Sequence, residues 1–199
     1  MNRYSFSKIQ KSSRRSFDAS YELQVADTSV LVTRKSMKSI RLKVTPLGEV
    51  RVSAPYNVSD DEIRHMVESR LEWIYSQQQA FANSPQSEAE RATKEEQEAW
   101  RAVVKACVPS LVEAWEPILG VQVKQLTYRN MKSRWGSCQP STGKICINIR
   151  LALYPPECLE YVVVHEMCHL LVANHGPGFK TLLTKVMPDW KRRADKLRA

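Results

Sequence analysis

The stretch Val164-His165-Glu166-Met167-Cys168-His169, followed six residues later by His175, decides how the rest of the chain is interpreted. It reads H-E-x-x-H and then x₅-H. Two His residues four apart lie on one face of a helix, about 40° from each other around the axis, and Glu166 lies next to that face. This geometry is typical of zinc hydrolases, in which two imidazoles bind the metal and the carboxylate accepts a proton from water.

An ordinary solvated helix face is the alternative interpretation of the same residues. The flanking runs Tyr161-Val162-Val163-Val164 and Leu170-Leu171-Val172 argue against it, because a helix that is apolar on nearly all sides is a buried helix. Burying two His residues and a Glu without partners would cost about 1–3 kcal/mol for each group. A bound metal removes that cost for the imidazoles, so the flanking sequence favours a metal site.

His175 is the candidate third ligand. In an unbroken helix it would lie about 9 Å beyond His169 along the axis and on another side, where it could not share a metal with the first two. We expect the helix to end near Val172, because Ala173-Asn174 and Gly176-Pro177-Gly178 favour a chain reversal that returns His175 to the site. Three protein ligands with a position open for water are the catalytic zinc pattern. The alternative is that His175 only caps the turn.

Length and composition are those of a globular protein with one large domain or two small ones. The chain has 199 residues, of which 43% are hydrophobic and 26% charged. Apolar runs are only a few residues long and no secretory segment opens the chain, so we expect no membrane association. The five Cys residues form no C-x-x-C pair, which fits reduced thiols and predicts a cytoplasmic location.

The net charge of +9 is unevenly distributed. Residues 121–199 contain 13 basic and 5 acidic residues, so this part alone has a net charge of +8. One interpretation is a surface for weak association with nucleic acid or another acidic partner. The favoured alternative is a solvated basic tail, because residues 191–198 supply much of the charge and no aromatic-basic stacking pattern accompanies it.

The N-terminal part is predicted to be rich in strands. Residues 1–20 are mostly Ser and basic residues and are expected to form a disordered arm. Residues 21–85 are expected to form two β-hairpins, the second around the turn 46–48, followed by a helix that opens with a capping box at 59–62. The polar stretch 83–87 is the best linker, and we place the domain boundary after residue 85.

Residues 86–199 are predicted to form the second domain. A long helix begins near Ser87 or Thr93, with Pro109 as the candidate start of a new segment, and Gly120 closes it. A strand at 121–128 and a hairpin with arms at 132–138 and 144–150 follow. The prolines at 155–156 end the last strand and begin the metal helix.

The last strand before the metal helix is the candidate substrate-binding edge. An extended peptide can bind to a free strand edge as an additional strand. The residues assigned to this edge are Lys144, Cys146 and Asn148. Cys168 lies beside His169 and is interpreted as a buried, inert thiol rather than as a ligand.

Several segments together resemble the YgjP-like metallopeptidase family, which is related to the SprT-like and WLM zinc peptidases. The resemblance also takes in the hairpin at 40–55, so it covers most of residues 35–198. Its segments are Arg129-Asn130-Met131-Lys132-Ser133-Arg134-Trp135-Gly136-Ser137-Cys138, Lys144-Ile145 through Asn148, Pro155-Pro156-Glu157, the run from Tyr161 to Leu170 with the H-E-x-x-H motif, Asn174-His175, and Met187-Pro188-Asp189-Trp190.

The resemblance implies a gluzincin-like catalytic core with defined site residues. His165, His169 and His175 match the metal ligands, and Glu166 matches the catalytic glutamate. The family usually continues after Asn-His with Ser or a similar residue, two variable positions and Phe-Trp. Here Gly176-Pro177-Gly178-Phe179-Lys180 keeps the Phe and departs around it, which predicts a local difference in the shape of the substrate pocket.

We therefore predict an α+β protein with a small antiparallel-strand N-terminal part and a compact zincin-like domain, in which helices pack on a small sheet. It binds one Zn²⁺ per chain and hydrolyses peptide bonds in a protein or peptide substrate, with Glu166 as general base. One alternative is a SprT-like protease acting on DNA-bound proteins. The other is a non-enzymatic adaptor stabilised by zinc, which would need a fourth protein ligand. The oligomeric state is not predicted.

Overall fold

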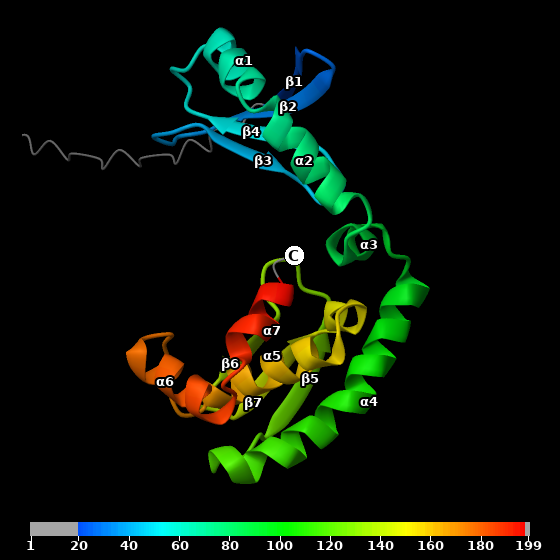
Figure 1. Ribbon diagram of the computed structural model, residues 1–199, viewed down its shortest axis with the longest axis vertical. Coiled ribbons are helices and arrows are strands. Elements are labelled where there is room, and N and C mark those ends of the chain that lie inside the picture. The colour runs from blue at the N-terminus through cyan, green and yellow to red at the C-terminus, as the bar shows by residue number, and fades with distance from the viewer. Residues whose placement is uncertain (1–19, 198–199) are drawn as a thin grey trace, which may run out of the picture. The chain divides into compact units, whose positions relative to one another are not determined.

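A computed structural model describes residues 20–197, and the predicted arm lies, apart from Ser20, outside the described residues. The chain divides into two compact units, one ending at Ala82 and the other beginning at Asn83 (Figure 1). Both units combine helices with a small sheet, so the α+β class predicted from the sequence is confirmed. Within the described residues, no helix is long and apolar enough to cross a bilayer.

The N-terminal unit is a four-stranded sheet covered by two helices. Its elements are β1 (Ser20–Val25), β2 (Thr28–Arg34), β3 (Arg41–Val44), β4 (Val50–Ala54), α1 (Asp60–Glu68) and α2 (Leu71–Ala82). The two expected hairpins, β1–β2 and β3–β4, are antiparallel, but β2 and β4 pair in parallel to give the order β1-β2-β4-β3. The sheet is therefore mixed, whereas an antiparallel one was expected.

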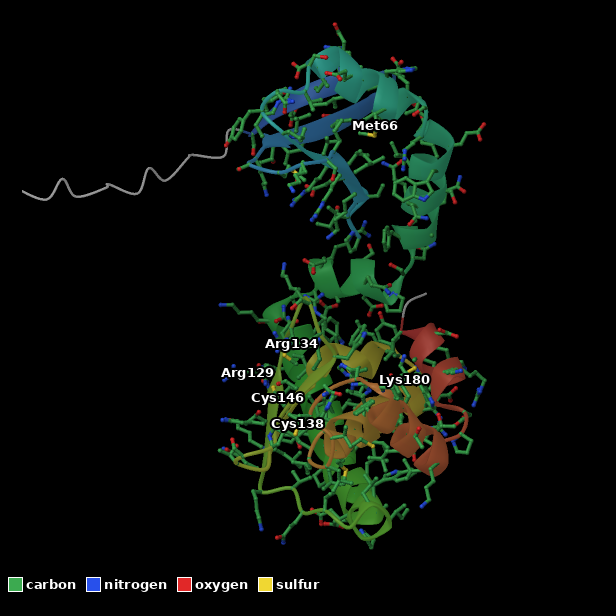
Figure 2. All side chains as sticks on the ribbon, turned by 90° about the vertical axis from the view of Figure 1, so that its left-hand side faces the viewer. Met66, Arg129, Arg134, Cys138, Cys146 and Lys180 are labelled. Carbon is green, nitrogen blue, oxygen red and sulfur yellow. The ribbon has the colours of Figure 1, made fainter. Side chains whose placement is uncertain are left out.

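Alternation of apolar and polar residues builds the core of this unit. Val30 and Val32 on β2 and Val50 and Val52 on β4 are at most 2% exposed, and the residues between them, Leu31 and Arg51, are partly or fully exposed. Met66 on α1 packs against this core (Figure 2). The predicted capping box is present: the Ser59 side chain accepts from the Glu62 backbone and the Glu62 carboxylate accepts from the Ser59 backbone.

The C-terminal unit packs helices on one face of a three-stranded sheet. Its elements are α3 (Pro85–Arg91), α4 (Lys94–Leu119), β5 (Gln125–Arg129), β6 (Gly136–Gln139), β7 (Lys144–Asn148), a 3-10 turn η1 (Ile149–Leu153), α5 (Pro156–Cys168), α6 (Pro177–Val186) and α7 (Trp190–Lys196). Both α4 and the sheet pack against α5, which holds the H-E-x-x-H motif.

The long helix α4 is continuous, which corrects the prediction that Pro109 starts a new segment. It begins with a second capping box at Thr93 and Glu96 and ends at Gly120, whose φ of 65° is left-handed. Pro109 interrupts one internal hydrogen bond. The helix nevertheless continues, because Val104, Val108 and Val112 form a buried stripe that packs on the core, and Figure 1 shows that α4 bends along its length.

Strand β7 is the central strand of the sheet, so the prediction that Lys144, Cys146 and Asn148 form a free edge is wrong. The order is β5-β7-β6: β7 pairs in parallel with β5 and antiparallel with β6. Its backbone groups are therefore used on both sides, and no peptide can be added to it. The edge strand beside α5 is β6.

Candidate metal centre

Helix α5 begins at the predicted proline and ends earlier than predicted. Pro156 occupies the first turn, where its missing N–H costs nothing. The helix ends at Cys168 with His169 as its C-cap, one turn before the predicted end at Val172. The chain then continues in turns, in which the Leu170, Leu171 and Val172 amides bond back to the carbonyls of Met167 and Cys168.

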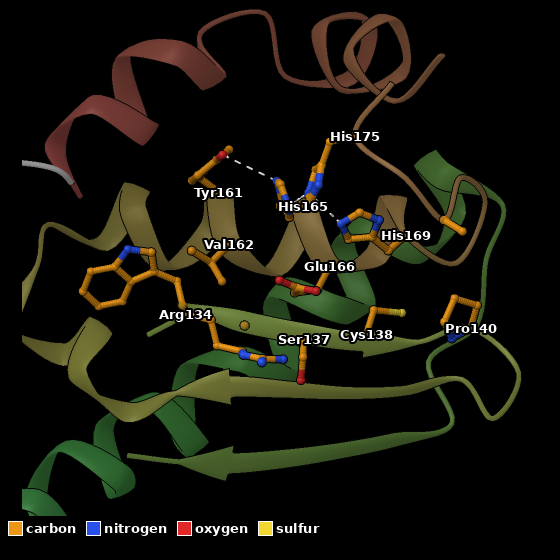
Figure 3. A pocket seen from close by; sticks show the side chains of 13 residues that line it. Arg134, Ser137, Cys138, Pro140, Tyr161, Val162, His165, Glu166, His169 and His175 are labelled. Carbon is orange, nitrogen blue, oxygen red and sulfur yellow. Dashed lines mark hydrogen bonds between the residues drawn. The ribbon is translucent and has the colours of Figure 1, made fainter. Parts of the chain in front are cut away.

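The structure brings His165, His169 and His175 together. Nε2 of His175 lies 2.9 Å from Nε2 of His165 and 3.0 Å from Nε2 of His169. Figure 3 shows the three rings pointing toward one another, two from α5 and its cap and one from the returning chain. The predicted chain reversal is therefore present, and His175 does more than cap a turn.

Neighbouring groups orient two of the three rings. Nδ1 of His169 lies 3.0 Å from the carbonyl oxygen of Val172, and a carbonyl can only accept, so Nδ1 carries the proton. The lone pair of the neutral ring is then on Nε2, which faces the cluster. On His165, Nδ1 faces the hydroxyl of Tyr161 at 3.5 Å, and this also leaves Nε2 toward the cluster.

The cluster fits a cation better than it fits hydrogen bonds among the rings. A single N–H on His175 cannot serve two Nε2 acceptors at once in linear geometry. Three imidazole nitrogens around one tetrahedral zinc, each about 2.0–2.1 Å from the metal, lie roughly 3.3 Å apart. The separations found here are close to that value, and the three nitrogens form the one group of His, Cys, Asp and Glu in the described residues that could hold a metal.

Burial keeps two of the imidazoles, those of His165 and His169, in the neutral form that binds metals. The pKa of His165 is lowered to about 4, mainly by burial and further by its two His neighbours, and burial also lowers the pKa of His169. Phe179, buried on α6, lies against all three rings, with centroid distances of 4.9 Å to His165 and His175 and 4.5 Å to His169. It excludes water from one side of the cluster.

Glu166 lies between the His cluster and the edge strand β6. It is 6% exposed, and burial raises the pKa of its carboxyl to about 7, against a smaller lowering effect of Arg134. A Cβ added at Gly136 on β6 would lie 2.6 Å from Cγ and Oε1 of Glu166. The glycine thus allows the backbone of β6 to approach the carboxylate closely.

The cluster and Glu166 open into a pocket of about 490 Å³ between α5 and β6 (Figure 3). The strand side is formed by the segment from Arg134 to Cys138 and by Pro140, and the helix side by Tyr161, Val162 and the motif residues. No residue of β7 lines it. A molecule that enters this pocket and reaches the three His residues would therefore lie against β6.

Two of the three strand residues assigned to substrate from the sequence, Cys146 and Asn148, are buried in the structure. Asn148 is 1% exposed, and its side chain donates to the carbonyls of Met131 and Arg134 and accepts from the amides of Met131 and Arg150. These four bonds position the segment that leads into β6. Cys146 is buried in the sheet.

Cys168 is fully buried, and burial raises the pKa of its thiol to about 11. A thiol with so high a pKa is protonated at neutral pH and is a poor ligand. The interpretation of Cys168 as inert agrees with these values.

Sequence reasoning did not assign roles to Gly136, Tyr161, Phe179 or the Val172 carbonyl. A glycine inside a strand is a known signal of close backbone approach, so Gly136 could have been found. Tyr161 is four residues before His165 on the helix and therefore shares its face, which is also a readable signal. The contacts of Phe179 and the Val172 carbonyl depend on the chain reversal and have no signal in the spacing.

A family model matches most of this chain. The family model described as YgjP-like, metallopeptidase domain, matches residues 38–102 and 84–199, and these two matches together run from 38 to 199. No curated protein is similar enough to this chain to count as a match.

Two metallopeptidase zymogens are among the solved structures similar to this chain. Abylysin of Pyrococcus abyssi is 25% identical, with a TM-score of 0.42, over 45% of this chain and 90% of its own. Jannalysin of Methanocaldococcus jannaschii is 20% identical, with a TM-score of 0.40, over 45% of this chain and 92% of its own.

Proposed function

Because this chain belongs to the YgjP-like metallopeptidase family, we propose that it is a zinc-dependent peptidase with Glu166 as its general base. One zinc ion per chain would be held by His165, His169 and His175. The observation that supports this proposal is the convergence of three Nε2 atoms, one from each His ring, on one place. Three imidazoles are a ligand set that suits zinc.

A zinc ion held by these three His residues would act as a Lewis acid, polarising the scissile carbonyl and lowering the pKa of a water molecule. Glu166 lies on the wall of the same pocket, and its buried carboxylate accepts the proton of the attacking water and returns it to the leaving nitrogen. Burial favours this role, because a carboxyl with a pKa near neutrality can both accept and release a proton at physiological pH.

Strand β6 replaces β7 as the proposed substrate-binding edge. It pairs with β7 on one side only, and its residues 136–138 line the pocket opposite His165 and Glu166. A peptide added along β6 would continue the sheet and bring its backbone carbonyls past the His cluster.

The adaptor alternative is not favoured by the geometry. A structural zinc site is closed by four protein ligands. In residues 20–197, no fourth His, Cys, Asp or Glu joins the three His residues. All five Cys residues are free thiols, which supports the proposed cytoplasmic location.

The test combines zinc analysis with a peptidase assay on three variants. The wild-type chain should bind one zinc and cleave unfolded protein or peptide. His175→Ala should lose zinc, whereas His65→Ala, which changes an exposed His in the N-terminal unit, should not. Glu166→Gln should keep zinc and lose roughly 10²–10⁴-fold in kcat. Unchanged activity in Glu166→Gln would refute the proposed mechanism.

A further inference from the structure

The three-stranded sheet has two unlike faces. Leu126, Tyr128, Ile145 and Ile147 point toward the helices and belong to the core. The register places Thr127, Cys146 and Ser137 side by side in one row on the opposite face, since residues of a strand alternate between faces. This outer face, defined by the outward residues of β5, β7 and β6, borders a second pocket of about 420 Å³.

The outer face is positively charged. Residues 117–156 contain six basic residues and no Asp or Glu. Two of the six, Lys132 and Arg150, form ion pairs with Glu90. Three others, Arg129, Arg134 and Lys144, line the second pocket and form no ion pair within the part of the chain that the structure describes.

Figure 2 shows Arg129, Arg134 and Cys146 on one side of the C-terminal unit. The lining of this pocket also includes hydroxyl and amide groups and no carboxylate. A pocket with unneutralised cations and additional hydrogen-bond donors is complementary to an anion.

The second pocket and the active-site pocket meet at β6. Arg134, Ser137 and Cys138 line both of them. On β6, the register turns Gly136 and Cys138 toward α5 and turns Ser137 and Gln139 toward the outer face. In Figure 3, Cys138 lies beside Glu166 while the Ser137 hydroxyl points to the other side of the strand. The edge strand therefore separates the two pockets without isolating one from the other.

A peptide bound along β6 would reach both pockets with alternate side chains. Side chains of an added strand alternate with a period of two, as in any strand. One set would face the His cluster and the other set would face Arg134 and the outer face. We propose that this enzyme selects peptides with acidic side chains at the positions that face Arg129, Arg134 and Lys144; the proposal rests on the peptidase function proposed above.

The size of the outer face sets how many acidic residues it can accept. Lys144 pairs with Gln125, and Arg129 pairs with Asn148, so the two cations are four residues apart along the strands. At about 3.3 Å per residue, this separation is roughly 13 Å. Outward side chains of an extended peptide repeat every two residues, or about 6.6 Å, so two or three successive outward positions span the distance between the two cations along the strands.

The test compares two peptides that differ only in having Glu or Gln at alternate positions near the scissile bond. Binding is measured by fluorescence anisotropy on zinc-loaded Glu166→Gln protein, and kcat/KM is measured on the wild type. We expect about a tenfold preference for the Glu peptide at low ionic strength, decreasing with added salt, because each exposed pair contributes up to about fivefold.

Matched double variants test whether the preference for the Glu peptide comes from the outer face. Arg129→Gln/Lys144→Gln removes two positive charges from it, and the preference should fall to within about threefold of unity. Lys180→Gln/Lys185→Gln removes two exposed charges from α6 and should leave the preference unchanged. An equal loss in both variants would mean that only net charge matters and would overturn the proposal.

The remaining outcomes separate this proposal from the proposed function. Cleavage of both peptides at equal rates overturns the acidic selectivity and leaves the peptidase intact. If neither peptide is cleaved but the Glu peptide still binds better through Arg129 and Lys144, the result supports the acidic-peptide surface and contradicts the proposed peptidase function. A single-stranded oligonucleotide that displaces the Glu peptide and binds more tightly through the same cations would identify a nucleic-acid surface and overturn the proposal.

Discussion

The two units bury different kinds of side chain. In the N-terminal unit, the buried polar residues are Thr28 and Thr45, and all other buried side chains among its described residues are apolar. The C-terminal unit buries Asn148, Arg150 and Glu166 together with two serines. A buried charged group costs several kcal/mol unless it is paired or changes its protonation state, so a fold retains one where it has a role.

The buried polar residues of the C-terminal unit fall into two kinds: those that hold the chain in position and one that can take part in chemistry. Arg150 is paired with Glu90 and Asn148 is fully hydrogen-bonded, so both stabilise the chain around β6. Glu166 has no ion-pair partner among residues 20–197, and its pKa is raised by burial. Among its described residues, the N-terminal unit contains no buried charged group of this kind.

The largest expected effect is on stability, and it tests whether the units are independent. Ile63 and Ile147 are both fully buried, one in each core. Ile63→Ala and Ile147→Ala should each cost about 2–5 kcal/mol in the free energy of unfolding. Zinc at 100 times its Kd should restore about 2.7 kcal/mol to the C-terminal unit only.

Denaturation followed by circular dichroism, with and without zinc, measures both effects. The Ile63→Ala transition should be insensitive to the metal and the Ile147→Ala transition should shift with it. A zinc-dependent shift of the Ile63→Ala transition would show that the units unfold together.

The next effect is on catalysis and concerns Gly136. Its φ is not positive, so an Ala is allowed by the backbone, but the added Cβ would meet Glu166 at 2.6 Å. Because Glu166 is buried, it must shift, and a displacement of about 1 Å of a catalytic group costs on the order of 100-fold. Gly136→Ala should therefore lower kcat strongly while zinc content stays at the wild-type level.

Gly178 supplies the matched control for this experiment. It lies at the start of α6, its φ is also not positive, and a Cβ there would meet nothing within 4 Å. Gly178→Ala should keep wild-type kcat. Equal activity of the two variants would show that β6 does not set the position of Glu166.

Local signals in the sequence were sufficient to predict structural features that depend only on neighbouring residues. The capping box at Ser59, the end of α4 at Gly120 and the proline that begins α5 were all predicted, because a few adjacent side chains determine each of them. The return of His175 was also predicted from the Gly and Pro residues around it. The assignment of the three His residues and Glu166 to metal binding and catalysis stays a prediction.

Features that depend on distant contacts were not predicted. The prediction that β7 is a free edge was wrong because β5, about 20 residues earlier, pairs in parallel with it. No local signal in the sequence indicates that pairing. A clue was present: Cys146 and Asn148, which alternate with the isoleucines, are uncharged, as expected for a central strand that is buried on both faces. Likewise, Pro109 is tolerated in α4 through packing that only the tertiary structure reveals.

The smallest expected effect is on the pH dependence of stability, and it again compares the units. A hydrogen bond from Lys132, together with Arg150, lowers the pKa of Glu90 in the C-terminal unit. Bonding to Tyr21, together with Arg34, lowers the pKa of Asp60 in the N-terminal unit. A carboxyl with a lowered pKa stabilises the fold at pH values above its unfolded pKa of about 4, and this contribution is lost as the pH falls through the folded pKa.

Glu90 and Asp60 should contribute unequally to the loss of folding stability at low pH. The side chain of Glu90 is 19% exposed and that of its partner Arg150 is 10% exposed, whereas the Asp60 side chain is 46% exposed and its ion pair with Arg34 is more strongly screened. Urea unfolding between pH 3 and 7 should therefore show a larger loss of acid sensitivity in Glu90→Gln than in Asp60→Asn. The reverse order would mean that the Tyr21–Asp60–Arg34 network, although exposed, anchors its unit more firmly than the Glu90 pairs anchor the segment that leads to β6.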